Sequence, residues 1–312
     1  MTPESGALRR RPLRAGWLAA LVRLPPFLWL GAFFLVPFAI TLKISLSEPA
    51  TAMPPYLPVL DWQGGIEGWS TFLEALHFGN YEMIAGDALY RDAALSSLGL
   101  ALTATAILAC LGTPLAYAMA RTPGRLQPLL VALLVVPFWT SFLIRVYAWI
   151  AILKPEGLLN AGLLRLGLIR EPLEILNTQG AVMIGLVYAY LPFMVLPLYA
   201  VMSRIDPALR EAAADLGASP TRVFWTVTLP LSLPGLAAGG LLCFIPMVGE
   251  FIIPDLLGGS DTLMLGRVLW SEFFSNRDWP LASAVAILLL VILVGPVVLF
   301  REAETRRGEA AR

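Results

Sequence analysis

Long uncharged, apolar runs alternate with short polar segments along the whole chain. A membrane-spanning helix needs about 20 mainly apolar residues, so uncharged runs of about this length are candidate spans. Six such runs occur, at residues 25–41, 93–120, 126–144, 175–203, 223–249 and 279–300. The first is short, but it reaches full length if it extends past Lys43 to Leu46, with the lysine amine reaching outward to water. The pattern therefore predicts six transmembrane helices.

One polar interruption, at residues 206–230, carries helix signals of its own. Asp206 is a good N-cap, and Pro207 suits the first helical position because its missing N–H would have no partner there. Small apolar residues at helical spacing then form one face, namely Leu209, Ala212, Ala213 and Leu216. Gly217 is expected to end this helix in the left-handed conformation. Ser219-Pro220 repeats the start signal for a second short helix, and Pro230 begins the next apolar run. The segment predicts a helix–glycine–helix elbow along the membrane face.

Composition and charge agree with a membrane protein and give its orientation. The chain is 58% hydrophobic and 14% charged, with a mean hydropathy of +0.74, whereas roughly a quarter of the residues are charged in soluble domains. With the N-terminus inside, the cytoplasmic segments hold 14 Lys and Arg residues and the external segments hold 6. The positive-inside rule therefore predicts that both termini and the elbow are cytoplasmic.

Several classes of function are disfavoured. The net charge is zero, whereas a nucleic-acid-binding domain is usually basic. Cys110 and Cys243 both lie in apolar runs and His77 is the only histidine, so no metal site is expected. No cofactor motif is found, and without a glycine-rich phosphate loop the chain is not expected to hydrolyse ATP by itself.

The elbow resembles a known family motif. Glu211-Ala212-Ala213, followed by Gly217 and then Leu229-Pro230, is similar to the EAA loop of permease subunits of ABC importers. In that family the loop holds a coupling helix that docks into a cytoplasmic ATPase. The resemblance implies a type I ABC importer permease fold, which is all-α. The ATPase-coupling residues that it implies are Glu211, Ala212, Ala213, Asp215, Gly217, Leu229 and Pro230.

A wider resemblance covers about residues 80 to 300. It rests on Pro114-Leu-Ala-Tyr117, the segment 137–149, Leu191-Pro-Phe193, the segment 246–254 and Trp279-Pro280-Leu281. These segments are similar to permeases of the spermidine/putrescine type, which implies import of a polyamine or a similar small organic cation. Members of the group also import amino-acid derivatives or iron, so those substrates stay open. A secondary transporter is the rival class, but it would be expected to show inverted repeats and unwound segments in both halves.

The resemblance also implies partners and a location. One coupling loop serves one ATPase, so a second permease, expected to be a non-identical paralogue, would complete the pair of docking points on an ATPase dimer. A periplasmic solute-binding protein would deliver the substrate, and the chain would lie in the inner membrane. The expected organisation is a cytoplasmic tail (1–24), a first helix (25–46), a periplasmic loop (47–90), a five-helix core (91–300) with the coupling loop (204–229), and a tail (301–312).

The third predicted span continues past its uncharged run to Leu153 and holds aromatic residues that suit a pathway for organic cations. On a continuous helix Trp139 and Tyr147 lie within about 80° of each other, and Trp149 points away. Aromatic faces attract ammonium groups by about 0.5–2 kcal/mol each. We therefore expect Trp139 and Tyr147 to line the pathway and Trp149 to face lipid or a neighbouring helix; packing between helices is the alternative.

The fifth span is expected to continue past its uncharged run to about Leu257, which makes Glu250 the one acidic residue well inside an apolar segment. Ionisable residues in spans mark pathways or find partners. One hypothesis makes Glu250 a counter-charge for a passing ammonium group. The other pairs it with Arg145, because straight third and fifth spans would place both about 10–12 Å below the outer boundary. The second hypothesis, a structural ion pair beside the pathway, is slightly favoured.

Overall fold

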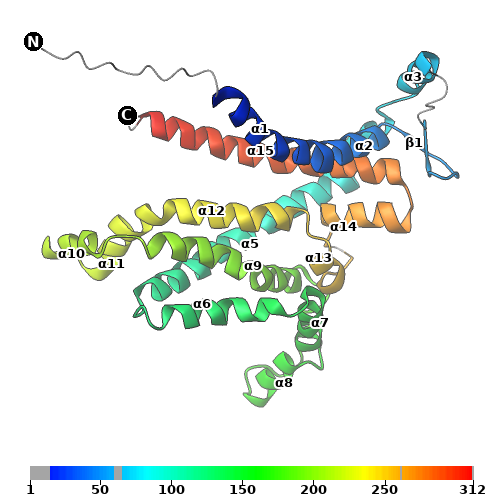
Figure 1. The fold of residues 1–312 in the computed structure, drawn as a ribbon. Helices are drawn as coiled ribbons and strands as arrows, with labels where there is room; N and C mark the ends of the chain where they lie inside the picture. The colour runs from blue at the N-terminus through cyan, green and yellow to red at the C-terminus, as the bar shows by residue number, and fades with distance from the viewer. Residues whose placement is uncertain (1–14, 60–64, 261, 311–312) are drawn as a thin grey trace, which may run out of the picture. The chain divides into compact units, whose positions relative to one another are not determined.

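The computed structural model describes residues 15–59, 65–260 and 262–310, and most of these residues are helical (Figure 1). Residues 1–14 of the predicted N-terminal tail and the end of the predicted C-terminal tail, 311–312, lie outside the described residues. The first helical segments are α1 (Ala15–Leu30), η2 (Gly31–Leu35) and α2 (Val36–Ser45), and they form one continuous span over Arg23–Ser45. The segment that follows α2 contains β1 (Glu48–Pro49), β2 (Tyr56–Leu57), α3 (Gly65–Glu74) and α4 (Gly79–Gly86).

The remaining helices follow the predicted order. They are α5 (Ala88–Arg121), α6 (Gln127–Val135), η3 (Val136–Trp139), α7 (Phe142–Leu153), α8 (Leu158–Arg165), α9 (Gln179–Met202), α10 (Pro207–Asp215), α11 (Pro220–Val223), η4 (Phe224–Thr228), α12 (Leu229–Val248), α13 (Ile252–Leu257), α14 (Leu265–Trp270), η5 (Ser271–Ser275) and α15 (Trp279–Ala310). Helix α15 continues past Phe300, so the predicted tail at 301–312 begins as helix rather than as a separate segment.

Six apolar segments correspond to the six predicted spans. Among the described residues, 4 unbroken helices are long and apolar enough to cross a membrane: Arg23–Ser45, Ala88–Arg121, Gln179–Met202 and Pro220–Val248. A fifth span is bent by 89° between Gln127–Trp139 and Phe142–Arg165, and α15 contributes a shorter apolar stretch, Trp279–Gly295. The prediction of an all-α membrane protein is confirmed, but the third predicted span is not a straight helix.

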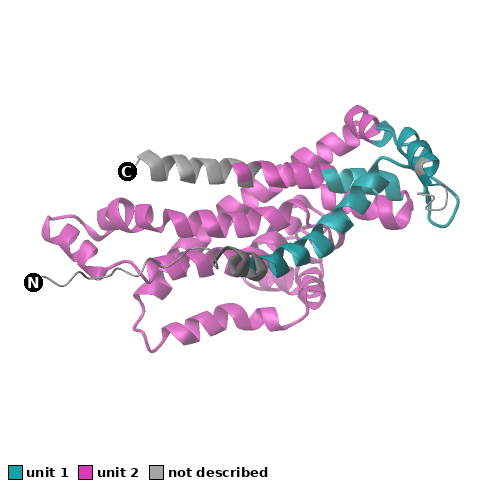
Figure 2. Cartoon of the chain, turned by 45° about the horizontal axis from the view of Figure 1, so that its top comes forward, with its two compact units in different colours: residues 1–80, 279–287 teal, residues 81–278, 288–312 magenta. Residues whose placement is uncertain are grey.

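The chain forms two compact units, shown in different colours in Figure 2. The first consists of residues 1–80 and 279–287, and the second of residues 81–278 and 288–312. Each unit is therefore built from segments that are distant in sequence.

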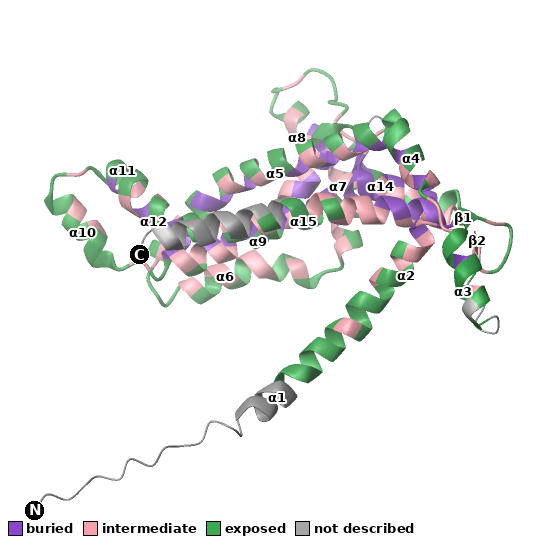
Figure 3. Ribbon diagram, turned by 90° about the horizontal axis from the view of Figure 1, so that it is seen from above, coloured by how far each residue is buried: buried purple, intermediate pink, exposed green. Residues whose placement is uncertain are grey.

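Helices α5, α9 and α12 form the core of the second unit, where buried residues are concentrated (Figure 3). Leu108 of α5, Leu186 and Met194 of α9, and Met247 of α12 are fully buried. Glycines allow these helices to approach closely. A Cβ at Gly239 would lie 3.0 Å from the carbonyl oxygen of Met194, and a Cβ at Gly235 would lie 3.0 Å from that of Pro197. Gly235 and Gly239 are four residues apart and form a small-residue face that packs against α9, as such faces do in membranes.

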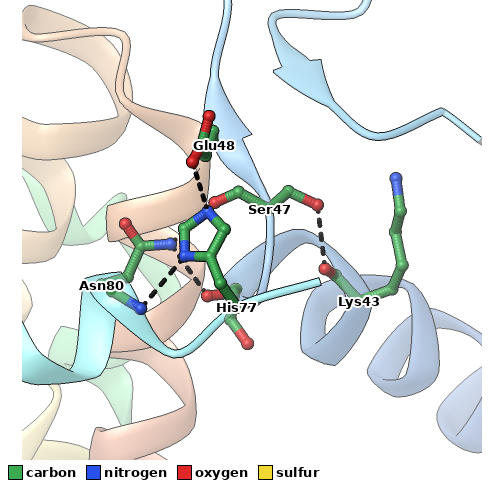
Figure 4. Close-up of polar contacts among 7 residues, drawn as sticks. Lys43, Ser47, Glu48, His77 and Asn80 are labelled. Carbon is green, nitrogen blue, oxygen red and sulfur yellow. Dashed lines mark hydrogen bonds and ion pairs between the residues drawn. The ribbon is translucent and has the colours of Figure 1, made fainter. Parts of the chain in front are cut away.

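The segment after the first span is folded against the end of that span. Strands β1 and β2 pair antiparallel. Lys43 donates from Nζ to the carbonyl of Pro58 (2.6 Å), and its ammonium lies 4.0 Å from the centre of the Tyr56 ring. The buried amide of Asn80 donates to the carbonyls of Ser45 (2.9 Å) and Ser47 (2.8 Å), which ties α4 to the end of α2 (Figure 4). These contacts give a defined structure to the described residues of the predicted periplasmic loop, 47–90, that belong to the first unit.

Candidate functional site

The predicted elbow contains a helix that is capped at both ends. The Asp206 side chain accepts a hydrogen bond from the amide of Ala208 (2.9 Å), and Pro207 occupies the first helical position. At the other end Gly217 has φ +84°, and the amide of Ala218 donates to the carbonyl of Ala213 (3.1 Å). These are the features of a Schellman C-cap, which satisfies carbonyls that the helix end would otherwise leave unpaired. The prediction that α10 begins at Pro207 and is ended by Gly217 is confirmed.

The second half of the elbow differs from the expectation. Ser219 caps α11, as predicted, by accepting from the amide of Arg222 (3.4 Å). However, α11 continues through the π-helical turn η4 into α12, so one helix runs from Pro220 to Val248. Leu229 and Pro230 therefore lie inside this helix and do not mark the start of a span. Pro230 is tolerated because it occupies one of the first positions after the π turn, where helical geometry already changes.

Helix α10 leaves an apolar and acidic surface without a partner in the described chain. Leu209 is 49% exposed and Leu216 is 90% exposed. Glu211, Ala212 and Asp215 are also exposed, and Ala213 is half-buried. Most of the predicted apolar face is thus turned away from the chain's own core. We call α10 with Leu216 and Gly217 the coupling knob.

The third span breaks at Thr140 and Ser141, between η3 and α7. The two sides differ in direction by 89°, so the angle of about 80° expected between Trp139 and Tyr147 on one helix does not apply. Both side chains are nevertheless exposed, Trp139 by 83% and Tyr147 by 57%. Trp149 instead packs edge-on against Tyr188 of α9, with ring centres 5.3 Å apart.

Trp139 also borders a cavity of about 450 Å³ that runs along α6. Its wall includes Gln127 and Tyr199, and the Tyr199 hydroxyl donates to Oε1 of Gln127 (3.1 Å). Neither Gln127 nor Tyr199 was predicted as a site residue from the sequence. A glutamine directly after the polar loop looks like an ordinary helix end, and its contact with α9 is visible only in three dimensions.

Glu250 lies in a break between α12 and α13, rather than within a helix as the straight fifth span required. Its Oε1 accepts hydrogen bonds from the amides of Phe251 (3.2 Å) and Ile252 (3.0 Å), and its Oε2 accepts one from the Tyr190 hydroxyl (2.8 Å). The buried carboxylate therefore caps the start of α13 and ties it to α9. No role was predicted for Tyr190 from the sequence.

The structure does not bring Arg145 and Glu250 together. The Arg145 guanidinium lies 4.2 Å from the centre of the Phe138 ring, and among the described residues its buried Nε and Nη1 have no hydrogen-bond partner. The argument for equal depth assumed two straight spans, and both are broken close to these residues. Phe138 contacts Phe193, which in turn contacts Tyr190, so aromatic rings lie between the cation and the carboxylate.

Among residues 15–59, 65–260 and 262–310, the structure contains no group of three His, Cys, Asp or Glu side chains that could hold a metal ion. Cys243 is buried, and its thiol contacts the carbonyl of Tyr190 at 3.5 Å.

Comparison with known proteins agrees with this architecture. A family model described as binding-protein-dependent transport system inner membrane component matches residues 13–300. The spermidine/putrescine transport system permease protein PotB of Haemophilus influenzae is 39% identical over 267 residues, which cover 86% of this chain and 87% of that protein. The protein of the same name from Escherichia coli K12 is 45% identical over 207 residues, 66% of this chain and 75% of that protein.

A solved structure extends the likeness to the fold. A chain of a bacterial alginate ABC transporter, in complex with an alginate-bound periplasmic protein, aligns with a TM-score of 0.68 at 17% identity. The alignment covers 93% of this chain and 94% of the other.

Proposed function

The chain belongs to the family of binding-protein-dependent transport system inner membrane components, and from this premise we propose that it is a permease subunit that carries polyamines into the cell. It is a transport component of an ATP-driven importer in the inner membrane, and ATP hydrolysis belongs to a separate subunit. Spermidine and putrescine are the proposed substrates because two relatives that carry those names are 39% and 45% identical.

The coupling knob is the observation that carries the proposed mechanism. A helix that is capped at both ends is held in a defined shape, yet its apolar residues Leu209 and Leu216 are exposed. Exposed apolar surface next to acidic residues suits a protein partner. We assign this surface to the groove of a cytoplasmic ATPase, with Glu211 and Asp215 as charged contacts and Ala212 and Ala213 as the close-packed face.

The remaining partners follow from this arrangement. One chain supplies one coupling knob, so two ATPases require a second permease, proposed to be a non-identical paralogue. A periplasmic solute-binding protein would deliver the substrate on the opposite side of the membrane. Both termini and the coupling knob are proposed to be cytoplasmic, and the distribution of Lys and Arg in the sequence supports this orientation.

The proposed substrate pathway includes Trp139 and Tyr147. Both rings are exposed on either side of the break in the third span, and an organic ammonium group is attracted to such faces. Glu250 lies in the same unit, but its oxygens are occupied by hydrogen bonds from the chain itself. It is therefore assigned to holding the α12–α13 break in place, near the pathway.

The decisive experiment reverses the charge of the coupling knob. Importers reconstituted with Glu211→Lys are expected to insert normally but to lose substrate-stimulated ATP hydrolysis. Glu171→Lys is a matched control, because Glu171 is also exposed but lies in the loop before α9. Full stimulation in the Glu211→Lys complex would overturn the assignment of the coupling knob.

Substrate class is tested separately. Uptake of labelled spermidine and putrescine into proteoliposomes, with the binding protein outside and ATP inside, is expected to saturate and to need ATP. Uptake of an iron complex or an amino-acid derivative in place of polyamines would contradict the substrate while leaving the coupling mechanism intact. Uptake driven by an ion gradient without ATP would contradict both.

A further inference from the structure

Two recesses meet beside the C-terminal end of α5 in the second unit. The larger has a volume of about 740 Å³ and lies between α5, the α11–η4 segment and α12. Its walls are mainly apolar, with Pro114 on α5, Trp225 on η4 and Leu236 on α12. This volume is within the range of small-molecule sites, about 300–1,000 Å³.

The smaller recess has a volume of about 260 Å³ and is polar at its rim. It shares Tyr117, Arg121 and Pro220 with the larger recess, so the two recesses adjoin each other. Its other wall is formed by α10, which contributes Arg210 and Glu211. Two guanidinium groups and one carboxylate therefore border a space that adjoins an apolar one.

The position of Arg121 at the junction is fixed by Tyr117. Its Nη1 donates to the Tyr117 hydroxyl (2.5 Å), and its guanidinium lies 5.2 Å from the centre of the Tyr117 ring. No described carboxylate forms an ion pair with Arg121 or Arg210. An arginine has five N–H donors, so both side chains keep donors for an anion.

The depth of the recesses matches the two parts of a lipid. Arg121 is the last residue of one span, Ala88–Arg121, and Pro220 is the first residue of another, Pro220–Val248. The polar recess is thus at the membrane surface, and the apolar recess extends from it toward the hydrocarbon layer. Trp225, 61% exposed, lies on the wall of the apolar recess, at the level where tryptophan is enriched in membrane proteins.

We propose that the two recesses form a binding site for one anionic phospholipid of the cytoplasmic leaflet. Its phosphodiester accepts hydrogen bonds from Arg121 and Arg210, and one acyl chain fills the apolar recess. Arginine pairs with phosphate through short charge-assisted bonds. Glu211 at the rim favours a headgroup with a single negative charge, such as phosphatidylglycerol, over more highly charged lipids.

A lipid in this position would contact both the end of α5 and the coupling knob. It would bridge α10 and the end of α5 through the polar recess that both elements line. The site is independent of the transported substrate. It rests on the proposed function in one respect, since the cytoplasmic location of α10 decides which leaflet the lipid belongs to.

The experiment uses the intact importer in vesicles of phosphatidylcholine that contain a trace of photoactivatable phosphatidylglycerol. Cross-links are expected on residues of the apolar recess. The double variant Arg121→Gln, Arg210→Gln is expected to lower cross-linking by at least about tenfold, because each arginine supplies a hydrogen bond to a charged group. Arg125→Gln is the matched control, since Arg125 is exposed in the next loop but lines neither recess.

Two further variants separate the parts of the site. Leu236→Trp fills the apolar recess and should lower cross-linking without changing charge, while the double variant Arg121→Lys, Arg210→Lys should retain most of it. Unchanged cross-linking in the Gln double variant would overturn the proposal. So would equal labelling by photoactivatable phosphatidylcholine, or cross-links from these residues to a protein subunit in place of lipid. None of these results depends on polyamine uptake or on the Glu211→Lys measurement.

Discussion

Glu250 closes the gap between α12 and α13 with three hydrogen bonds, and this explains why a carboxylate is tolerated there. Two come from backbone amides at the start of α13 and one from Tyr190. A buried charge is expensive unless it is paired or hydrogen-bonded. Glu250 satisfies this condition without Arg145, whose guanidinium instead stacks on Phe138.

We expect the charge swap Arg145→Glu with Glu250→Arg not to rescue either single change. Glu250→Gln should destabilise the protein by about 1–3 kcal/mol, because a hydrogen-bonded charge is lost at a buried site. Thermal unfolding of the purified chain in detergent measures the effect. Tyr190→Phe, which removes only the hydroxyl donor, should cause a loss of similar size.

An opposite result is informative. If the swapped pair is more stable than both single variants, Arg145 and Glu250 interact in a conformation that differs from the one described. If Glu250→Gln folds normally and loses only polyamine uptake, the carboxylate is a substrate ligand rather than a helix cap.

The two aromatic residues of α7 should respond differently to truncation. Tyr147→Ala removes an exposed ring, so it should raise the KM for polyamine uptake by about 2- to 30-fold with little change in stability. Trp149→Ala removes a ring that packs on Tyr188, so it should lower the thermal midpoint. Normal uptake kinetics in the Tyr147→Ala importer, with impaired kinetics in a stable Trp149→Ala importer, would contradict the assignment.

At the scale of elements, α10 depends on the left-handed backbone at Gly217. A β-branched residue there is strained by about 1–2 kcal/mol. Gly217→Val should therefore unravel the C-cap and lower ATPase stimulation, although the chain still inserts. Gly217→Asn should retain most of the activity, because asparagine tolerates this conformation. Equal stimulation by the Val and Asn variants would show that the cap is not needed for coupling.

The contact between α12 and α9 offers a matched pair of glycines. A Cβ at Gly239 would lie 3.0 Å from the Met194 carbonyl, whereas one at Gly240 would meet only a Thr105 methyl at 3.8 Å. Gly239→Ala should destabilise the core by about 1–3 kcal/mol. Gly240→Ala should be neutral or slightly stabilising, because alanine is favoured over glycine in helices. Thermal unfolding of both variants compares them, and equal midpoints would contradict the close packing.

Local chemistry made some elements predictable and others not. Asp206, Pro207 and Gly217 act on their immediate neighbours, so the bounds of α10 could be predicted from the sequence. The break at Thr140 and Ser141 was not predicted, because the run from Leu126 to Ile144 is apolar throughout. The hydropathy of a run does not show whether the helix axis changes direction within it. The arrangement of Arg145, Phe138 and Tyr190 depends on that break and was therefore out of reach.

At the scale of the whole molecule, the six apolar segments could be predicted because the thickness of a membrane leaves few alternatives for the length of a span, and the family could be predicted because the segment 206–230 resembles the EAA loop. The structure of the segment after the first span could not. Asn80 and Lys43 are ordinary polar residues in the sequence, and their role in tying that segment together becomes visible only through their contacts. The division into two units was not predicted either, since it joins residues 279–287 to the N-terminal part.

The orientation is tested on the intact chain. Alkaline phosphatase inserted after Glu67, in the predicted periplasmic loop, should be active because it folds outside the cytoplasm. Green fluorescent protein inserted after Asp215 should be fluorescent because it folds inside. The reverse pattern would place the coupling knob on the wrong side for an ATPase and would also exclude the cytoplasmic leaflet for the proposed lipid.

The unbroken helix from Pro220 to Val248 has a mechanical consequence. It has 29 residues, so it is a lever arm roughly 43 Å long, and a tilt of about 5° at its foot moves its tip by about 4 Å. The foot adjoins α10, and the tip is the break that Glu250 holds. The π turn at η4 (Phe224–Thr228) lies close to the foot, so most of the length of the helix lies beyond it. A partner protein that shifts the coupling knob slightly would therefore displace the α12–α13 break by about the width of a side chain.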